Sequence, residues 1–312
     1  MRSERQEYQK QKKKNRKWKR FFTTIFILFA AVFAYGFYQY KQGVSQSTER
    51  ANVQKVDYEF NGDVDQEGGT NILLLGSDSR GEEKARADTI MVARYHPDNG
   101  TYKLISFMRD TYLEIPGYGQ GRINTAFLKG GPELVRETLK ANFGLDLQYY
   151  AIVDFEGFVQ LVDEAFPEGL EIDVEKRMSK NIGVTLEPGL QRLDGKHLLG
   201  YVRFRQDAVG DFGRVERQQK VVKKIAEELT SIQSVPKLPK LVGVVTPFVN
   251  TNMDAADMVF IGKDFITSGN REISSLRVPV DGAWQNANIN GASVLAIDVQ
   301  KNREAIQGFI SK

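Results

Sequence analysis

The sequence predicts a layered α/β domain that follows a single N-terminal transmembrane helix. Twenty consecutive residues without charge occupy positions 21–40. An apolar run typical of a buried strand lies at residues 71–75, and β-rich segments alternate with helical patterns from there onward. The chain has 312 residues, 41% of them hydrophobic, so it is long enough to bury a sizeable core.

The N-terminus is predicted to anchor the protein in a membrane. Residues 1–20 carry ten Lys or Arg and two Glu. The uncharged residues 21–40 are long enough to cross a hydrocarbon core of about 30 Å as a helix. Positive residues favour the cytoplasmic side, so residues 1–20 form a cytoplasmic arm and residues 41–312 lie outside the cell membrane in a single-pass topology.

Two other interpretations of the N-terminus explain fewer of its features. A cleaved signal peptide would have a shorter apolar core followed by small residues, whereas Phe37, Tyr38 and Tyr40 are bulky. A basic tail could also bind nucleic acid without specificity. Beside a spanning helix, membrane topology and anionic lipid explain the same charges, and we expect no nucleic-acid partner.

The rest of the composition excludes several classes of site. The chain has no cysteine, which removes disulfides, thiol nucleophiles and iron–sulfur sites. His96 and His197 are its two histidines, too few for a histidine-ligated metal centre. Residues 21–312 hold 33 basic and 38 acidic residues, a net charge of −5, so the basic character belongs to the arm.

Beyond the anchor, polar residues 41–67 without periodicity predict an extracytoplasmic linker. Residues 68–312 are predicted to form one domain, because no linker divides them. Helical patterns occupy residues 132–142, 155–165, 194–200, 213–231 and 254–268. Strand patterns occupy residues 71–75, 89–95, 101–108, 149–153, 170–174, 201–205 and 273–279.

A hairpin is predicted around the turn at residues 97–100, Pro-Asp-Asn-Gly. Antiparallel partners around this turn have numbers that sum to about 197, so Asp88 faces Arg109 across the ladder. Taken alone, this pair reads as an ordinary cross-strand ion pair. Asp78, in the loop after the strand at 71–75, and Arg86 lie close by in the sequence.

A second cluster of basic residues follows near residue 200. Alternation in the predicted strand 201–205 places Arg203 and Arg205 on one face, where their mutual repulsion calls for an anion or for carboxylates from elsewhere. Residues 211–214 then open a helix in which Arg214 and Gln218 share a side with Arg217. The first turn of a helix also favours anions.

Together these residues predict a site for a pyrophosphate and a magnesium ion. The planar fork of arginine matches pairs of phosphate oxygens. Asp78 and Asp88 supply the hard oxygen ligands that Mg²⁺ prefers when it also holds substrate phosphates.

The order of these motifs resembles the LytR-CpsA-Psr family over about residues 70–230. The matching segments are NILLLGSDSR, RADTIMV, SFMRDTYLEIPG, RINTAF, LDGKHLLGYVRFRQ and DFGRVERQQ. The resemblance implies an α/β/α sandwich with a mixed central sheet. It also implies an extracytoplasmic phosphotransferase that moves a glycopolymer, such as teichoic acid or capsule, from undecaprenyl pyrophosphate onto peptidoglycan.

The resemblance also assigns residue roles. Asp78 and Asp88 correspond to the magnesium ligands. The residues that correspond to the pyrophosphate-binding set are Arg86, Arg109, Arg203, Arg205, Arg214 and Gln218. Of these, Arg109, Arg203 and Arg205 are expected to hold the charge that grows in the transition state. Independently of the resemblance, Asp211 is the candidate general base because it is acidic and lies beside the arginine cluster, although an N-cap role for the following helix is equally open.

Two departures from the family pattern are visible. Residues 165–170 read Ala-Phe-Pro-Glu-Gly-Leu where a Gly-Gly-Val turn is usual, and residues 206–210 are less acidic than usual. Two rival functions stay open: a polyprenyl-pyrophosphate hydrolase with water as the acceptor, and a non-enzymatic envelope regulator or transcription attenuator. Trp284 is interpreted as a packing residue rather than a carbohydrate contact.

Overall fold

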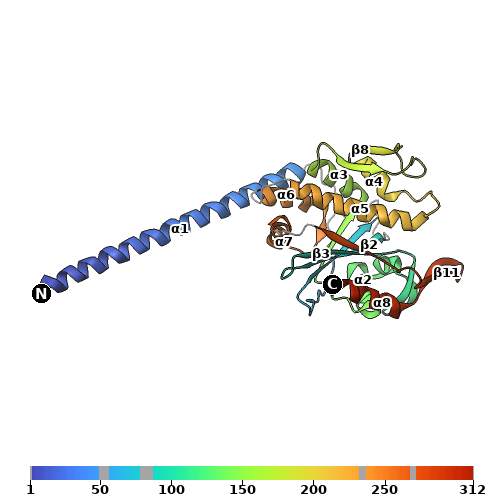
Figure 1. The fold of residues 1–312 in the computed structure, drawn as a ribbon, viewed down its shortest axis with the longest axis horizontal. Coiled ribbons are helices and arrows are strands. Elements are labelled where there is room, and N and C mark those ends of the chain that lie inside the picture. The colour runs from blue at the N-terminus through green and yellow to red at the C-terminus, as the bar shows by residue number, and fades with distance from the viewer. Residues whose placement is uncertain (1, 49–55, 78–86, 232–236, 268–271, 312) are drawn as a thin grey trace.

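The computed structural model describes residues 2–48, 56–77, 87–231, 237–267 and 272–311. A long helix, α1 (Arg2–Thr48), projects from the domain (Figure 1). Its segment Thr23–Thr48 is long and apolar enough to cross a membrane. The helix continues beyond the predicted span, so residues 41–48, predicted as the start of a linker, are helical instead.

A mixed sheet forms the centre of the domain, as the sequence predicted. Its strands lie in the order β10-β3-β2-β1-β6-β9. The pairs β1–β2 and β2–β3 are antiparallel, whereas β1–β6 and β3–β10 are parallel. In that order the strands span Ile273–Val278, Thr101–Phe107, Ala87–His96, Thr70–Ser77, Tyr149–Asp154 and Asn250–Thr251.

Helices cover both faces of this sheet and complete the α/β/α arrangement (Figure 1). On one face lie α2 (Asn124–Phe143) and α8 (Val299–Ile310). On the other lie α3 (Phe155–Ala165), α4 (Gly195–Arg203), α5 (Gly210–Ser231), α6 (Leu238–Val245), the short 3₁₀ helix η2 (Thr246–Phe248) and α7 (Ala255–Thr267).

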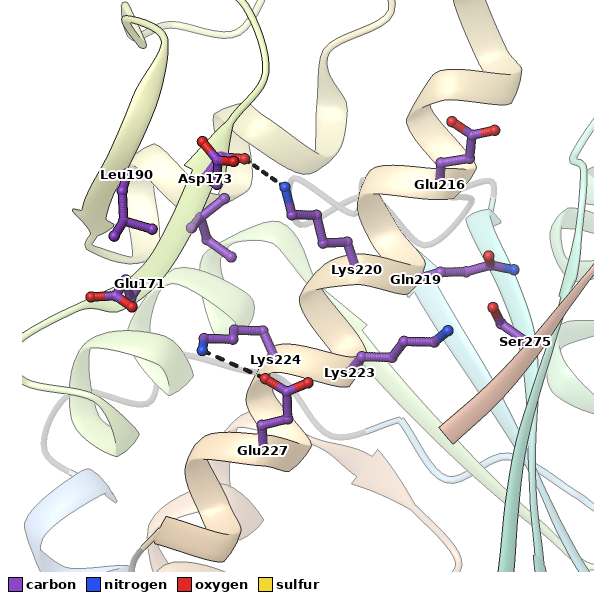
Figure 2. A pocket seen from close by; sticks show the side chains of 11 residues that line it. Glu171, Asp173, Leu190, Glu216, Gln219, Lys220, Lys223, Lys224, Glu227 and Ser275 are labelled. Carbon is purple, nitrogen blue, oxygen red and sulfur yellow. Dashed lines mark hydrogen bonds and ion pairs between the residues drawn. The ribbon is translucent and has the colours of Figure 1, made fainter. Parts of the chain in front are cut away.

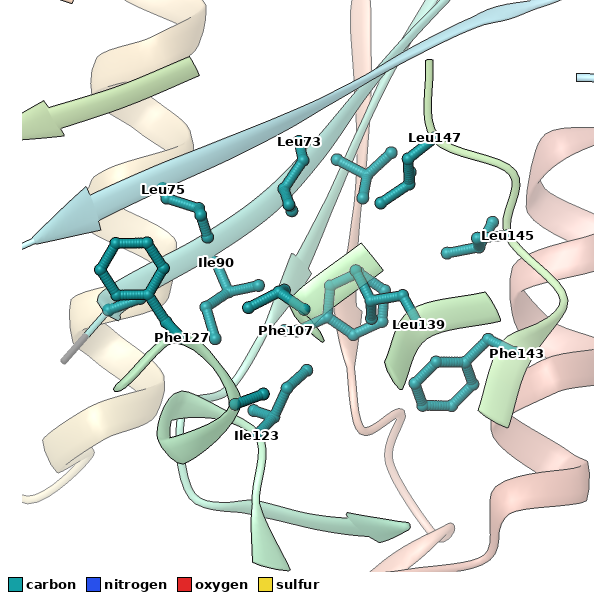
Figure 3. Close-up of a cluster of buried hydrophobic side chains, with 14 of the residues drawn as sticks. Leu73, Leu75, Ile90, Phe107, Ile123, Phe127, Leu139, Phe143, Leu145 and Leu147 are labelled. Atoms are coloured by element: carbon teal, nitrogen blue, oxygen red, sulfur yellow. The ribbon is translucent and has the colours of Figure 1, made fainter. Parts of the chain in front are cut away.

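The main core lies between the sheet and α2. Leu73 and Ile90 of the sheet are buried in one cluster with Leu139 and Phe143 of α2 (Figure 3). Burial alternates along β1, so only every second residue of the apolar run faces this core and the other side is partly exposed. The expectation of a strand fully buried on both faces was therefore only half correct.

Two smaller sheets extend the domain. β7 (Leu170–Val174) pairs with β8 (Gly189–Leu193) and packs with α4 and α5 around a second core. The other sheet has the order β11-β12-β4-β5, formed by Trp284–Ile289, Ala292–Ile297, Thr111–Ile115 and Gly119–Arg122. The ring of Trp284 packs against Phe212 in a tilted arrangement, with ring centroids 4.9 Å apart, which agrees with a packing role.

The predicted strand at 201–205 was wrong. Residues up to Arg203 belong to α4, which begins where the Asp194 side chain accepts a hydrogen bond from the His197 backbone N–H. One face of α4 buries Leu198 and Tyr201 completely. The alternating pattern of residues 201–205 fits a strand locally, but capping and burial of the preceding turn impose a helix.

Residues 56–67 are integrated into the domain, unlike a free linker. Tyr58 and Phe60 pack against the main core. Arg94 on β2 is buried and pairs with Asp65 at 2.7 Å. The backbone N–H of Asp63 donates to the Leu147 carbonyl. These contacts hold the chain against the sheet just before β1 begins.

Candidate functional site

The hairpin end is the first part of the site. Asp88 lies at the start of β2 and Arg109 directly after β3. Nη1 of Arg109 donates to Oδ1 of Asp88 at 2.8 Å, as the hairpin register predicted. Burial alone would lower the pKa of Arg109, but the hydrogen bond and charge of Asp88 raise it above its ordinary value. Arg109 therefore stays a cation at the edge of the sheet.

Beside this pair lies a cavity of about 190 Å³ that gathers residues from five parts of the chain. Its wall contains four basic side chains and one acidic side chain, so the lining has a net charge of +3. The lining residues are Asp88, Thr89, Phe155, Lys180, Asn181, Val202, Arg203, Arg205, Gln206, Arg214 and Gln218. Such a pocket favours an anionic ligand.

Arg203 and Arg205, which were predicted to lie on one face of a strand, both line this pocket. Arg203 is the last residue of α4, and Arg205 follows in the loop. The guanidinium of Arg203 lies over the ring of Phe155, 4.5 Å from its centroid. In the part of the chain that the structure describes, neither Arg203 nor Arg205 pairs with a carboxylate. Their charge is therefore available to a ligand.

Arg214 and Asp211 occupy the first turns of α5. Nη2 of Arg214 donates to Oδ2 of Asp211 at 3.0 Å and to the Asp88 carbonyl at 3.2 Å. Burial lowers the pKa of Arg214, and Asp211 partly opposes this shift. Asp211 lies inside the helix rather than at its N-cap, so the capping interpretation was wrong. Its carboxylate also approaches Nε of Arg109, at 3.8 Å.

Some of these buried polar atoms have no hydrogen-bond partner among the described residues. They are Nε of Arg109, Nε of Arg214 and Oδ1 of Asp211. Buried polar atoms are normally paired, so unpaired ones need an explanation. Here they surround the point where the hairpin end and α5 meet, next to the cationic pocket. An anion with several oxygens would suit the two donors.

The spacing predicted that Arg217 and Gln218 share one side of α5 with Arg214, but of these two only Gln218 lines the pocket. Gln218 lines the pocket, and its Nε2 donates to Oγ1 of Thr89 at 2.9 Å. Arg217 is buried elsewhere, where it binds Glu175 at 2.9 Å and the Phe204 carbonyl at 2.6 Å. Arg217 therefore holds the loop that carries Arg205, rather than lining the pocket.

Six of the lining residues were not among the predicted site residues. They are Thr89, Phe155, Lys180, Asn181, Val202 and Gln206. Phe155 opens α3 directly after β6, so a search of strand ends could have found it. Lys180 and Asn181 come from the irregular segment between β7 and β8, which carries no motif. Asn181 adopts a positive φ of 60° there.

Asp78 and Arg86 lie outside the described residues, so the structure describes only Asp88 of the two predicted magnesium ligands. No group of three or more acidic or histidine side chains in the described ranges could hold a metal ion. Asp88 uses Oδ1 for Arg109, while no described residue bonds to its Oδ2. A carboxylate oxygen without a partner among the described residues, beside a cationic pocket, would suit Mg²⁺, which usually takes few protein ligands.

A larger cavity of about 440 Å³ lies elsewhere, between α5 and the β7–β8 hairpin (Figure 2). Its lining mixes Lys220, Lys223 and Lys224 with Glu171 and Glu227. Lys224 is paired with Glu227 at 3.5 Å, and Lys220 bonds to the Asp173 carbonyl. Asp173 and Glu216 also line this cavity, so its four acidic side chains and three lysines give a net charge of −1. The smaller, cationic pocket is therefore the candidate site.

Comparisons with known proteins agree with this fold. The model of the LytR_cpsA_psr family matches residues 33–307. Regulatory protein MsrR of Staphylococcus aureus strain COL is 44% identical over 276 residues, which cover 88% of this chain and 84% of MsrR. Polyisoprenyl-teichoic acid–peptidoglycan teichoic acid transferase TagU of Bacillus mycoides strain KBAB4 is 30% identical over 265 residues, covering 83% and 85%.

Solved structures show the same architecture. A crystal structure of Bacillus subtilis TagV aligns with a TM-score of 0.68 and 24% identity, covering 79% of this chain and 99% of TagV. TagT bound to LI-WTA aligns with a TM-score of 0.64 and 22% identity, covering 84% and 98%. At this identity the likeness supports the fold alone.

Proposed function

Because this chain belongs to the LytR-CpsA-Psr family, we propose that it is a membrane-anchored phosphotransferase of cell-wall assembly. It takes a glycopolymer of the teichoic acid or capsule type from undecaprenyl pyrophosphate and joins it to peptidoglycan through a phosphodiester. Its catalytic domain faces the outside of the membrane. The observation that carries the proposal is the cationic pocket, in which Arg203 and Arg205 have no carboxylate partner among the described residues.

The pocket residues divide into three tasks. Arg203 and Arg205 bind the diphosphate, together with Arg86 from the segment outside the described residues. Arg214 lines the pocket and Arg109 lies beside it, and the Nε of each has no hydrogen-bond partner among the described residues, so both can stabilise the charge that grows on the phosphates. Gln218 on α5 holds the start of β2 in position through its hydrogen bond to Thr89. Phosphoryl transfer requires mainly such positioning and charge neutralisation.

Asp78 and Asp88 are the residues that would hold the magnesium ion. Bound there, the ion would neutralise part of the negative charge on the diphosphate. The protein's own contribution is to orient the Asp88 carboxylate through its ion pair with Arg109.

In the proposed step, a peptidoglycan hydroxyl oxygen forms a bond to the glycan-linked phosphorus. The bridging P–O bond breaks, and undecaprenyl phosphate leaves with the electron pair. The hydroxyl proton passes to Asp211, whose Oδ1 has no hydrogen-bond partner among the described residues. No nucleotide is needed, because the diphosphate linkage already stores the required energy.

A transfer assay tests this function. The full-length protein in vesicles is given a labelled lipid-linked glycopolymer, Mg²⁺ and purified peptidoglycan. We expect label to become attached to the peptidoglycan, and we expect Arg203→Ala with Arg205→Ala to abolish the attachment. Cleavage of the lipid donor without any joined product would instead identify a hydrolase.

A regulatory function is the second candidate, because MsrR, the relative with 44% identity, is named a regulatory protein. Direct contact with DNA is difficult for a domain outside the membrane. A chromosomal Arg203→Ala, Arg205→Ala variant separates the two candidates. If the regulatory phenotype of a deletion persists in this variant, regulation follows from lost catalysis; if the variant restores normal regulation, the protein acts without catalysis.

A further inference from the structure

The C-terminal part of helix α1 packs against α6, so this part of the helix belongs to the domain. Between Thr23 and Thr48, the residues that lose exposure lie three or four positions apart, on one stripe of the helix. They are Gly36, Gln39, Tyr40, Gly43, Val44 and Ser47. Ser47 is fully buried. The remaining residues of this segment are exposed.

The contact is a close crossing built on two glycines. A Cβ on Gly43 would overlap the Lys240 carbonyl oxygen, and a Cβ on Gly243 would overlap the Tyr40 carbonyl oxygen. Backbones approach this closely only where side chains are absent, as in membrane helix pairs with small residues at the interface. The crossing fixes the direction of α1 relative to the domain.

For a span that ends at Tyr40, as the sequence predicts, the same crossing would place α6 at the level of the lipid headgroups. Gly36 lies next to Pro239 in the first turn of α6. The predicted span ends at Tyr40, so α6 overlaps its outer end by about 6 Å. The run Leu238–Phe248 is apolar, and its buried side chains, such as Val242 and Val244, pack inside the domain. Its outer surface includes the exposed Lys237 and the partly exposed residues Pro239, Lys240, Leu241 and Val245. An apolar helix flanked by lysines suits the boundary between acyl chains and anionic headgroups.

Helix α7 adds a second apolar contact at this end of the domain. Gly262 of α7 lies against Leu238 of α6. The exposed stripe of α7 carries Phe260, which is 57% exposed, and Lys263. Figure 1 shows α6 and α7 at the end of the domain where α1 leaves it, and β11 at the opposite end.

We propose that α6 and α7 form a second membrane-contact surface, which rests in the headgroup region of the outer leaflet and holds the domain upright on the bilayer. The inference rests on α1 as the proposed membrane anchor, and not on the transferase activity. Helix α5 runs from the cationic pocket toward this end (Figure 1). From Arg214 to Ser231 it measures on the order of 25 Å, which sets the height of the pocket above the lipid.

Single-cysteine labelling tests the contact, because the natural chain has no cysteine. The full-length variants Lys237→Cys, Phe260→Cys and, as the control, Asn288→Cys on β11 carry an environment-sensitive fluorophore. They are reconstituted in phosphatidylcholine vesicles with about one third phosphatidylglycerol. Matched vesicles carry a nitroxide quencher near the headgroup.

We expect the labels at positions 237 and 260 to lose most of their fluorescence in the nitroxide vesicles, while the label at 288 keeps it. The loss should shrink when Gly43→Ala is added to the Phe260→Cys protein, but not when Gly36→Ala is added. Unquenched labels at all three positions, with the protein retained after carbonate washing, would show that the domain stands clear of the bilayer. Equal quenching at all three would also overturn the contact, and loss of protein in the wash would overturn the anchor itself.

Discussion

Arg109 and Asp88 meet across the open end of the β2–β3 hairpin, with Nη1 2.8 Å from Oδ1. The ladder joins partners from His96–Thr101 to Ile90–Phe107 without a shift. The ion pair continues the same register beyond the last ladder pair. Arg109 also lies near Asp211 of α5, so a single cation links the sheet to the helix that builds the pocket.

Removing this cation should damage catalysis more than folding. In Arg109→Ala, we expect the transfer rate to fall by about 10²- to 10³-fold, because a charge aimed at the transition state is lost. The labelled-donor assay measures the rate, and circular dichroism checks the fold. Arg192→Ala, an exposed arginine on β8, serves as the matched control. An unchanged rate in Arg109→Ala would remove Arg109 from the catalytic set.

The stacking of Arg203 on Phe155 predicts that a lysine cannot replace this arginine. Arg203→Lys keeps the charge but loses the planar contact, so donor affinity should fall about threefold to thirtyfold. Phe155→Leu should produce a similar loss through the same contact. Titration of a polyprenyl pyrophosphate measures both. The exposed Arg177, which pairs with Glu187, provides the control Arg177→Lys; equal affinities in all these proteins would contradict the prediction.

The two possible roles of Asp211 separate kinetically. If Asp211 accepts the proton, Asp211→Asn lowers kcat by about 10²- to 10⁴-fold and removes the acidic limb of the kcat–pH profile. The donor KM should change little. If Asp211 only holds Arg109 and Arg214 in place, the donor KM rises and the shape of the profile stays. The pH profile of kcat, measured for both proteins, decides between them.

Stability should decrease in acid through Glu175. Burial raises the pKa of this carboxyl, but hydrogen bonds from its backbone, Arg217 and Tyr201 lower it overall, below its ordinary 4.5. Because the folded-state pKa is lower than the unfolded-state pKa, the ionised carboxyl stabilises the fold, and this stabilisation is fully present above the ordinary pKa of 4.5. It is lost as the pH falls through the folded-state pKa. Glu175→Gln should therefore be less stable at pH 7 and respond less to acid.

Urea unfolding of the full-length protein in detergent, followed by tryptophan fluorescence, measures this response. The exposed Glu168→Gln is the control. Parallel pH dependences for the natural protein and Glu175→Gln would exclude Glu175 as a source of the acid sensitivity.

The glycine crossing between α1 and α6 predicts opposite effects for two similar substitutions. Replacing a helical glycine by alanine usually stabilises a helix by about 1 kcal/mol. Gly36→Ala meets only Pro239 at 3.8 Å and should follow this rule. Gly43→Ala meets the backbone of α6 and should lower the thermal unfolding midpoint. A midpoint raised equally by both would argue against the close crossing.

Local sequence signals predicted the parts of the site that short-range chemistry controls. The turn at residues 97–100 fixed the hairpin register, and with it the Asp88–Arg109 pair. The helix of residues 213–231 and the strand of residues 170–174 were predicted close to their observed bounds. The membrane helix followed from the twenty uncharged residues alone.

Tertiary contacts decided the rest. Alternation at residues 201–205 indicated a strand, yet burial of Tyr201 beside Glu175 and the cap at Asp194 make the segment a helix. The spacing of Arg217 matched the pocket face, but buried bonds to Glu175 turn it away. Lys180 reaches the pocket from a loop without any local pattern.

Isothermal titration of the full-length protein with farnesyl pyrophosphate and Mg²⁺ most directly tests whether the arginine pocket is a diphosphate site. We predict saturable binding by the natural protein, no measurable binding by Arg203→Ala, Arg205→Ala, and unchanged binding by the Arg177→Lys control. Farnesyl monophosphate should bind more weakly than the pyrophosphate. Equal affinity of the natural protein and the double variant for farnesyl pyrophosphate would contradict the account.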